Sequence, residues 1–198
     1  MCKILLINAC VKPGSRTMEL TQTLLKTLDG RFEEVRLYET PPAALDLEGL
    51  EKRNQAAREQ DFSHPVFNAA KQFAAADVIV IAAPYWDLMF PAVLKTYLES
   101  ITVAGITFRY SDQGRPESLC KAKVLHYVTT AGGFIGQNDF GFAYVKAVAQ
   151  NFFGITQIHR YGAEGLDIYG ADVDKIMEEA KRNISGASPE SIIEHPET

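Results

Sequence analysis

The chain has 198 residues and a formal net charge of −5 at pH 7, and 46% of its residues are hydrophobic. This length suits one domain with its own core, and the apolar content argues against intrinsic disorder. The acidic balance argues against a surface that grips nucleic acid or an anionic membrane, since both need clustered cations.

Two further features bear on location. The apolar runs are much shorter than the roughly 20 residues that a membrane-spanning helix needs, and the first residues lack the layout of a signal peptide. Three cysteines, Cys2, Cys10 and Cys120, are odd in number and lack metal or redox spacing. We therefore expect a cytoplasmic protein whose cysteines are structural or incidental.

Short apolar runs alternate along the chain with segments of helical periodicity. The runs KILLIN and DVIVIAA are apolar on both faces, which is typical of central parallel strands. In chain order, the predicted elements are a strand at 3–8, a helix at 17–28, a strand at 32–38, helices at 47–58 and 65–76, a strand at 77–83, a helix at 91–102, a short extended segment at 104–110, a strand at 122–128, a helix at 139–153, a strand at 155–161 and a helix at 173–184.

Strands and helices alternate five times in this order. The pattern predicts an α/β fold, a doubly wound five-stranded parallel sheet with helices on both faces. We expect one domain over residues 1–185 and a polar tail at 186–198. The charged helix at 47–58 is predicted to be mobile or to act as a partial lid.

In such a sheet, ligands bind beyond the carboxyl ends of the strands, near the switch in strand order. Three loops that leave carboxyl ends have unusual composition, at residues 10–17, 84–90 and 129–134. With strand order 2-1-3-4-5 they follow strands one, three and four, which are neighbours. We therefore expect the three loops to meet at one site.

The first loop, CVKPGSRT, leads into a helix. Ser15 and Thr17 bring hydroxyl groups, Arg16 brings a positive charge, and the helix N-terminus brings free N–H groups, so the position suits a phosphate. The alternative is a plain helix cap by Ser15 or Thr17. The chain lacks both GxxxxGK[ST] and GxGxxG, so a nucleotide-hydrolase loop and a Rossmann site are weakly supported.

The other two loops add aromatic rings and backbone donors. Tyr85, Trp86 and Asp87 follow the third strand, and the TTAGG segment ends in the adjacent Gly132 and Gly133. The alternatives are that the aromatics plug the sheet edge and that TTAGG is an ordinary turn. Together the three loops fit a flavin mononucleotide better than a dinucleotide or a metal, since no His, Cys or carboxylate cluster has ligand spacing.

Residues 82–114, AAPYWDLMFPAVLKTYLESITVAGITFRYSDQG, resemble the central part of the FMN-dependent NADH azoreductases. That family lies within the NAD(P)H:quinone oxidoreductase group of flavodoxin-like proteins. The resemblance implies a flavodoxin-like fold and a homodimer with FMN at each of two interface sites. The matching residues are Pro84, Trp86, Leu94, Lys95, Tyr97, Ala104, Gly105, Thr107, Phe108, Tyr110 and Gly114.

The resemblance also implies which residues contact the cofactor and the substrate. The phosphate maps to the first loop, the isoalloxazine ring to the second, and backbone donors to the third. The expected FMN contacts are Cys10, Ser15, Arg16, Thr17, Pro84, Tyr85, Trp86, Asp87, Leu88, Thr130, Ala131, Gly132 and Gly133. The expected substrate slot is walled by Trp86 and Phe134, with Phe108 and Tyr110 from across the dimer.

The function implied is an FMN-dependent NAD(P)H oxidoreductase that reduces quinones, azo or nitro aromatic compounds by ping-pong hydride transfer. The flavin carries this chemistry, so no catalytic side chain and no metal are expected. The alternatives are a flavodoxin-type electron carrier and a flavin-free scaffold. Asp87 stands where the family usually has Asn, and Leu88 where it usually has an aromatic. An ionised Asp only accepts hydrogen bonds, so we expect Asp87 to lower the flavin potential, to be protonated or to turn away.

Overall fold

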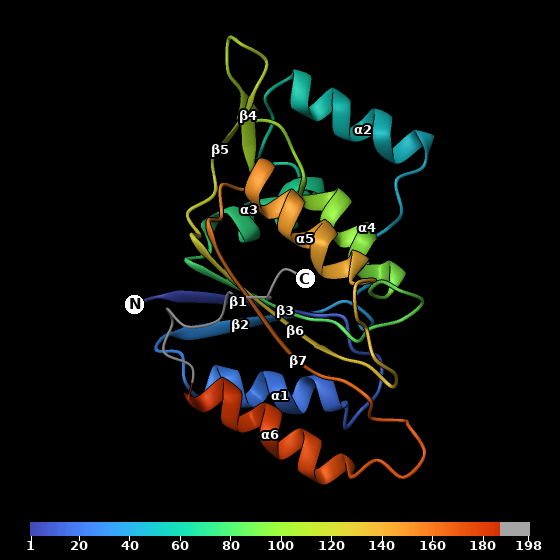
Figure 1. The fold of residues 1–198 in the computed structure, drawn as a ribbon. Coiled ribbons are helices and arrows are strands. Elements are labelled where there is room, and N and C mark those ends of the chain that lie inside the picture. The colour runs from blue at the N-terminus through green and yellow to red at the C-terminus, as the bar shows by residue number, and fades with distance from the viewer. Residues whose placement is uncertain (187–198) are drawn as a thin grey trace.

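Five parallel strands form the central sheet, in the order β2-β1-β3-β6-β7 (Figure 1). This confirms the predicted doubly wound sheet and its order 2-1-3-4-5. The computed structural model describes residues 1–186, so apart from Gly186 the predicted tail lies outside the described residues. The strands are β1 (Lys3–Asn8), β2 (Arg31–Arg36), β3 (Val78–Ala82), β6 (Val124–Thr130) and β7 (Gln157–Ala163).

Strand β1 lies inside the sheet, between β2 and β3, because both of its faces are apolar. Ile4 and Leu6 face one hydrophobic cluster, and Leu5 and Ile7 face the other. The strand pairs with β2 on one side and with β3 on the other. All four side chains are almost completely buried, which fixes the strand at the centre of the fold.

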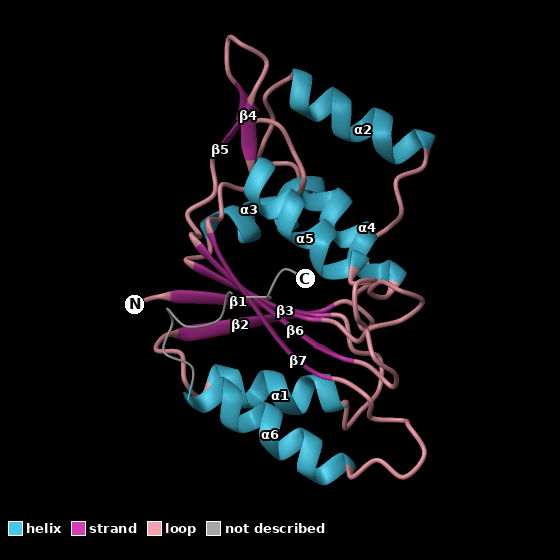
Figure 2. Cartoon of the chain, viewed as in Figure 1, coloured by secondary structure: helices cyan, strands magenta, loops and turns pink. Residues whose placement is uncertain are grey.

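Helices cover both faces of the sheet (Figure 2). Helices α1 and α6 pack together on one face, and α3, α4 and α5 lie on the other. The helices are α1 (Arg16–Leu25), α2 (Leu47–Arg58), α3 (Asn68–Ala75), α4 (Ala92–Ile101), α5 (Phe140–Asn151) and α6 (Val173–Gly186), with a 3₁₀ turn η1 (Pro65–Phe67) before α3.

One strand pair was only half predicted. The extended segment at 104–110 contains β4 (Phe108–Tyr110), which pairs antiparallel with β5 (Pro116–Ser118). The second strand escaped prediction because a three-residue strand that begins with proline has no apolar alternation. This hairpin projects beyond the α3–α5 layer (Figure 2).

Helix α2 confirms the predicted helix at 47–58. Its N-cap is Asp46, whose side chain accepts a hydrogen bond from Gly49 N at 2.8 Å. The helix lies on the same side of the sheet as α4 and α5 and buries only Ala56 (Figure 1). Whether it moves as a lid stays a prediction.

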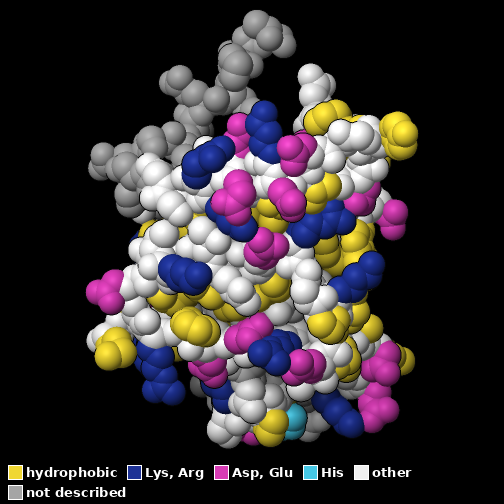
Figure 3. Space-filling model, turned by 90° about the horizontal axis from the view of Figure 1, so that it is seen from below, with side chains coloured by type: hydrophobic (Ala, Val, Ile, Leu, Met, Phe, Trp, Pro, Cys, Tyr) yellow, Lys and Arg dark blue, Asp and Glu magenta, His cyan; other side chains and the backbone are white. Residues whose placement is uncertain are grey.

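The outer surface is mixed in charge. Over α1 and α6, basic and acidic side chains are interspersed rather than gathered by sign (Figure 3). Within residues 1–186, every helix is too short or too polar to cross a bilayer.

Candidate functional site

A cavity of about 360 Å³ opens where β1, β3 and β6 end. The three loops singled out in the sequence meet there, together with a fourth loop between β7 and α6. The cavity is lined by Cys10, Val11, Lys12, Pro13, Gly14, Ser15, Arg16, Thr17, Pro84, Tyr85, Trp86, Thr130, Ala131, Gly132, Leu166 and Asp167.

The side chain of Asn8 fixes the start of the first loop through two hydrogen bonds. Its Oδ1 accepts a hydrogen bond from Cys10 N, and its Nδ2 donates to Glu34 Oε1, each at 2.8 Å. Ser15 begins α1, and its carbonyl accepts from Glu19 N at 3.0 Å. Within the described chain the Ser15 hydroxyl makes no cap hydrogen bond, so the plain side-chain cap is not formed. The hydroxyl and the first-turn N–H groups are therefore available to an anion.

Arg16 and Thr17 tie the first loop to its neighbours. Arg16 donates to the Leu166 carbonyl at 3.1 Å and pairs with Asp167 Oδ1 at 2.8 Å. Thr17 is buried, and its hydroxyl lies 2.6 Å from the Thr130 hydroxyl. The charge of Arg16 is thus shared with a carboxylate, and Thr17 joins α1 to the end of β6.

Cys10 lies at the back of the first loop, with its Sγ 3.7 Å from the Ala82 carbonyl. Burial raises the pKa of its thiol, and the nearby Ser15 and Thr17 side chains offset only part of this effect. The side chain is therefore a neutral thiol at pH 7, not a nucleophilic thiolate.

The second loop makes a tight turn directly after Pro84 and Tyr85. Trp86 and Met89 exchange two backbone hydrogen bonds of 2.8 Å. Asp87 and Leu88, at the tip, have φ values of 50° and 67°. Such turns favour Asn and Gly, so Leu88 is held at an energetic cost.

This turn decides which of its residues reach the cavity. Trp86 lines it and is 41% exposed. Tyr85 is fixed by its N–H to the Thr130 carbonyl and by its hydroxyl to the Asn138 carbonyl, each at 3.0 Å. The cavity lining found among residues 1–186 does not include Asp87 or Leu88, which lie on the turn beyond it.

The third loop is paired with the loop that follows β7. Asp167 N donates to the Gly132 carbonyl at 2.9 Å, and Gly165 N donates to the Gly133 carbonyl at 3.0 Å. A Cβ on Gly132 would clash with Asp167 Oδ2, so the carboxylate packs directly on this glycine. Gly133 itself lies outside the cavity lining described for residues 1–186.

Leu166 and Asp167 were missed by sequence reasoning. They follow the fifth strand. The loop at its carboxyl end was not predicted to line a site, because it has no hydroxyl or aromatic residues at its start. The available signal was a pair of glycines, Gly165 and Gly170, which both adopt positive φ and bracket the loop.

A charged network fixes the segment after the third loop. Arg160 pairs with Asp139 at 2.7 Å and with Glu164 at 3.0 Å. Glu164 also accepts from Ile135 N at 2.9 Å. Phe134 is left 78% exposed beside this network.

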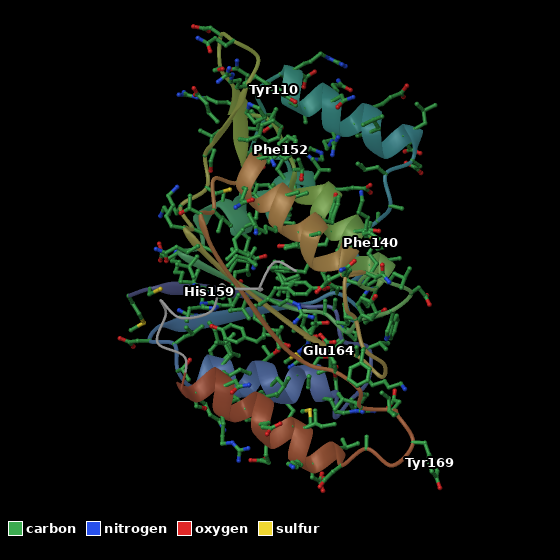
Figure 4. The ribbon with its side chains drawn as sticks, in the orientation of Figure 1. Tyr110, Phe140, Phe152, His159, Glu164 and Tyr169 are labelled. Atoms are coloured by element: carbon green, nitrogen blue, oxygen red, sulfur yellow. The ribbon has the colours of Figure 1, made fainter. Side chains whose placement is uncertain are left out.

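The hairpin aromatics do not reach this cavity within one chain. Phe108 is 5% exposed and packs on Phe152, with ring centroids 5.0 Å apart. Tyr110 is 60% exposed at the hairpin. Figure 4 shows Tyr110 and Phe152 in the upper part of the molecule and Glu164 in the lower half. Their predicted place beside a flavin therefore depends on a second copy of the chain.

Among residues 1–186, no three His, Cys, Asp or Glu side chains are grouped so that they could hold a metal ion. The cavity instead offers the Ser15 hydroxyl, the N–H groups at the start of α1, aromatic rings, and Arg16, which also pairs with Asp167. This donor set suits an anionic group joined to a flat ring.

Comparisons with known proteins place this geometry in a family. A family model described as the flavodoxin-like fold matches residues 2–186. The FMN-dependent NADH:quinone oxidoreductase of Clostridium beijerinckii is 35% identical over 189 residues, which cover 91% of this chain and 94% of that protein. The enzyme of the same description from Caldicellulosiruptor saccharolyticus is 34% identical over 191 residues, covering 91% of this chain and 94% of its own.

Solved structures agree on the fold. An azoreductase from Bacillus anthracis superposes with a TM-score of 0.81 at 22% identity, covering 94% of this chain and 98% of its own. An FMN-dependent NADH-azoreductase from the same species, in complex with FMN, gives 0.77 at 23% identity, covering 93% and 96%. The chain therefore belongs to the flavodoxin-like family that includes the FMN-dependent NADH:quinone oxidoreductases.

Proposed function

We propose that the chain is an FMN-dependent NAD(P)H oxidoreductase that reduces quinones and azo or nitro aromatic compounds. The observation that carries the proposal is a cavity that brings three features together: the first loop, which suits a phosphate, Trp86 on the second loop, and Gly132 on the third. Its relatives of about one-third identity, described as FMN-dependent NADH:quinone oxidoreductases, support the same assignment.

The residues present fit FMN. The Ser15 hydroxyl and the N-terminal N–H groups of α1 suit its phosphate, because they make no intramolecular cap. Pro84, Tyr85 and Trp86 offer a rigid, partly aromatic surface for the ring. Gly132 leaves room for the Asp167 carboxylate, which holds Arg16 and its positive charge at the mouth of the cavity.

When bound, FMN would supply two-electron transfer between a nicotinamide reductant and the acceptor. The chain binds, orients and shields the reactants. N–H groups of the third loop would stabilise negative charge that develops on the bound ring. Trp86 and Phe134 provide apolar surface for flat acceptors. Both reactants use the same face in turn, which makes the kinetics ping-pong.

We also infer a homodimer in the cytoplasm. A groove of about 280 Å³ between α2, α4 and α5 supports a contact surface, since it is lined by Leu45, Leu98, Val148 and Phe152 among others. The exposed Tyr110 ring also needs a partner surface to reach a flavin. All three cysteines are free, which supports a reducing compartment.

The test is the visible spectrum of the purified protein, followed by addition of NADH and then menadione. We expect a yellow flavin spectrum that bleaches with NADH and recovers with menadione, and parallel double-reciprocal lines in steady state. Ser15→Ala should weaken FMN binding by about tenfold through loss of a hydrogen bond to a charged group. Thr23→Ala, on the same helix but outside the cavity, is the matched control.

Two outcomes would contradict the proposal. A colourless protein that takes up no added FMN would favour a flavin-free scaffold. A flavin that bleaches only with a partner reductase, with little menadione turnover, would favour an electron carrier.

A further inference from the structure

Arg160, on β7, bridges two carboxylates that belong to different segments of the chain. Its Nε lies 2.7 Å from Asp139 Oδ2, and its Nη2 lies 3.0 Å from Glu164 Oε1. Asp139 directly precedes α5, whereas Glu164 directly follows β7. A guanidinium can hold both carboxylates at once because its N–H groups point in fixed, separate directions. Among residues 1–186, the lining of the proposed FMN cavity does not include this arginine.

The two carboxylates hold both ends of one short turn, which connects the third loop to α5. At the start of the turn, Ile135 N donates to Glu164 Oε2 at 2.9 Å. At its end, Asp139 Oδ1 accepts from a backbone N–H of α5 at 3.0 Å and caps that helix. The turn is closed by Asn138 N, which donates to the Ile135 carbonyl at 3.2 Å. The guanidinium therefore fixes where this turn lies.

The turn in turn holds one wall of the FMN cavity. Tyr85 lines the cavity, and its hydroxyl donates to the Asn138 carbonyl at 3.0 Å. Burial raises the pKa of this hydroxyl, and the charges of Asp139 and Glu164 raise it further, so it stays protonated and remains a donor. Because the backbone N–H of Tyr85 is also bonded, to the Thr130 carbonyl, the direction of the ring depends on the position of the turn.

Glu164 also connects the third loop to the loop that follows β7. The next residue, Gly165, donates its N–H to the Gly133 carbonyl at 3.0 Å. Leu166 and Asp167, directly beyond it, line the cavity. A displacement of the Glu164 carboxylate would therefore move the third loop and the loop after β7 together.

Without the arginine, these carboxylates would face each other with no shared cation. The Asp139 side chain is 18% exposed and that of Glu164 is 29% exposed, so water screens their charges only in part. Like charges at this range repel, and the loss of one member of a partly buried ion network leaves the others uncompensated. The two carboxylates would then separate, and each would carry its own segment with it.

We propose that Arg160 is a positioning residue for the flavin: by bridging Asp139 and Glu164, it sets the spacing between the Tyr85 ring and the third loop. The guanidinium acts on the bound ring only through these other residues, so it is not a catalytic residue. The inference rests on the proposed function and adds to it the residue that adjusts the cavity to the ring.

The test measures FMN release when the full-length holoprotein is diluted, followed by the fluorescence of the freed flavin, together with the visible absorption bands of the bound flavin. Arg160→Gln should raise the Kd for FMN by about tenfold and move the bands toward those of free FMN, because the ring is held less closely. Arg160→Lys should raise the Kd by about threefold, since an ammonium keeps the charge but lacks the two-pronged geometry.

Two double variants separate positioning from a general loss of folding. Adding Glu164→Gln to Arg160→Gln removes one of the two repelling charges, while the new amide oxygen can still accept from Ile135 N. This double variant should bring the Kd to within about threefold of the wild type. In a Tyr85→Phe background, Arg160→Gln should raise the Kd by less than in the wild type, because the hydroxyl that links the ring to the turn is already absent.

Lys181→Gln is the matched control. Lys181 is 27% exposed and also bridges two carboxylates, those of Glu19 and Glu178, each at 2.7 Å. It lies on α6, and the FMN cavity lining described for residues 1–186 does not include it. The Kd for FMN and the absorption bands of Lys181→Gln should therefore equal those of the wild type.

Wild-type affinity and wild-type absorption bands in Arg160→Gln would overturn the inference. So would a loss that Glu164→Gln does not reduce and that is equally large in the Tyr85→Phe background. If Arg160→Gln does not fold, wild-type affinity in Arg160→Lys would overturn it instead. A wild type that binds no FMN would refute the proposed function, so the two failures are distinguishable.

Discussion

The stability of the protein should fall in acid because of a buried histidine, His126 on β6. Its ring stacks on His159 at a centroid distance of 5.2 Å and on Tyr161 at 5.8 Å. Among the residues that the structure describes, its Nδ1 has no hydrogen-bond partner. Burial, with a smaller effect of His159, lowers the pKa of His126 from 6.5 to about 4.

The sign follows from linkage. Between these two pKa values the unfolded chain binds a proton that the native protein does not, so the free energy of unfolding falls as pH falls. Above pH 6.5 the residue makes no pH-dependent contribution. Between pH 6.5 and 4 the loss accumulates at about 1.4 kcal/mol per pH unit, and it reaches roughly 3 kcal/mol.

Urea unfolding curves at pH 7, 6 and 5, for the wild type and His126→Leu, test this reasoning. The leucine variant should be as stable as the wild type at pH 7 or more stable, because an unpartnered buried polar atom is removed. At pH 5 its advantage should have grown by about 2 kcal/mol. The carboxylates titrate in both proteins, so the difference isolates the histidine. Equal pH slopes in the two proteins would refute the argument.

Three further predictions concern the cavity and its turn. Leu88→Gly should stabilise the protein by about 1 kcal/mol and raise Tm by about 2–4 °C, since glycine adopts positive φ without strain; a lower Tm in thermal unfolding would contradict this. Gly132→Ala should displace the Asp167 carboxylate and shift the third loop itself, weakening FMN binding by about threefold in a fluorescence titration. The added Asp167→Ala change should remove the steric part of that effect, and a double variant no different from Gly132→Ala alone would exclude the clash. Asp87→Asn should raise the two-electron midpoint potential by about 20 mV, because loss of a screened charge is worth about 1 kcal/mol; an unchanged potential in a redox titration would rule out the electrostatic role of Asp87.

The central strands were predictable because apolar runs with no polar face have one common place in a protein, whereas their order was taken from the flavodoxin-like fold. KILLIN and DVIVIAA became the neighbouring strands β1 and β3 for this reason. The meeting of three loops followed from the strand order alone. In a parallel sheet of known strand order, the loops after neighbouring strands lie at the same edge, so their meeting can be predicted.

Side-chain partners were not predictable in the same way. Nothing in the sequence shows that Arg16 pairs with Asp167, 151 residues away, or that Thr17 is buried against Thr130. Phe108 was expected to wall the substrate slot from across the dimer, and nothing in its segment shows that it is buried against Phe152. Such contacts depend on how the helix layers pack on the sheet, and no local sequence pattern determines this packing.

The joining of Thr17 to Thr130 has a consequence for biosynthesis. The loops that form the flavin cavity come from residues 10–17, 84–86, 130–132 and 166–167, so its walls are spread over most of the polypeptide. Because chains emerge from the ribosome N-terminus first, the earliest loop waits for its counterparts until translation is nearly complete. FMN binding must therefore be a late event in synthesis. A nascent chain that stalls before β7 would have the first loop but lack Leu166 and Asp167, which complete the cavity.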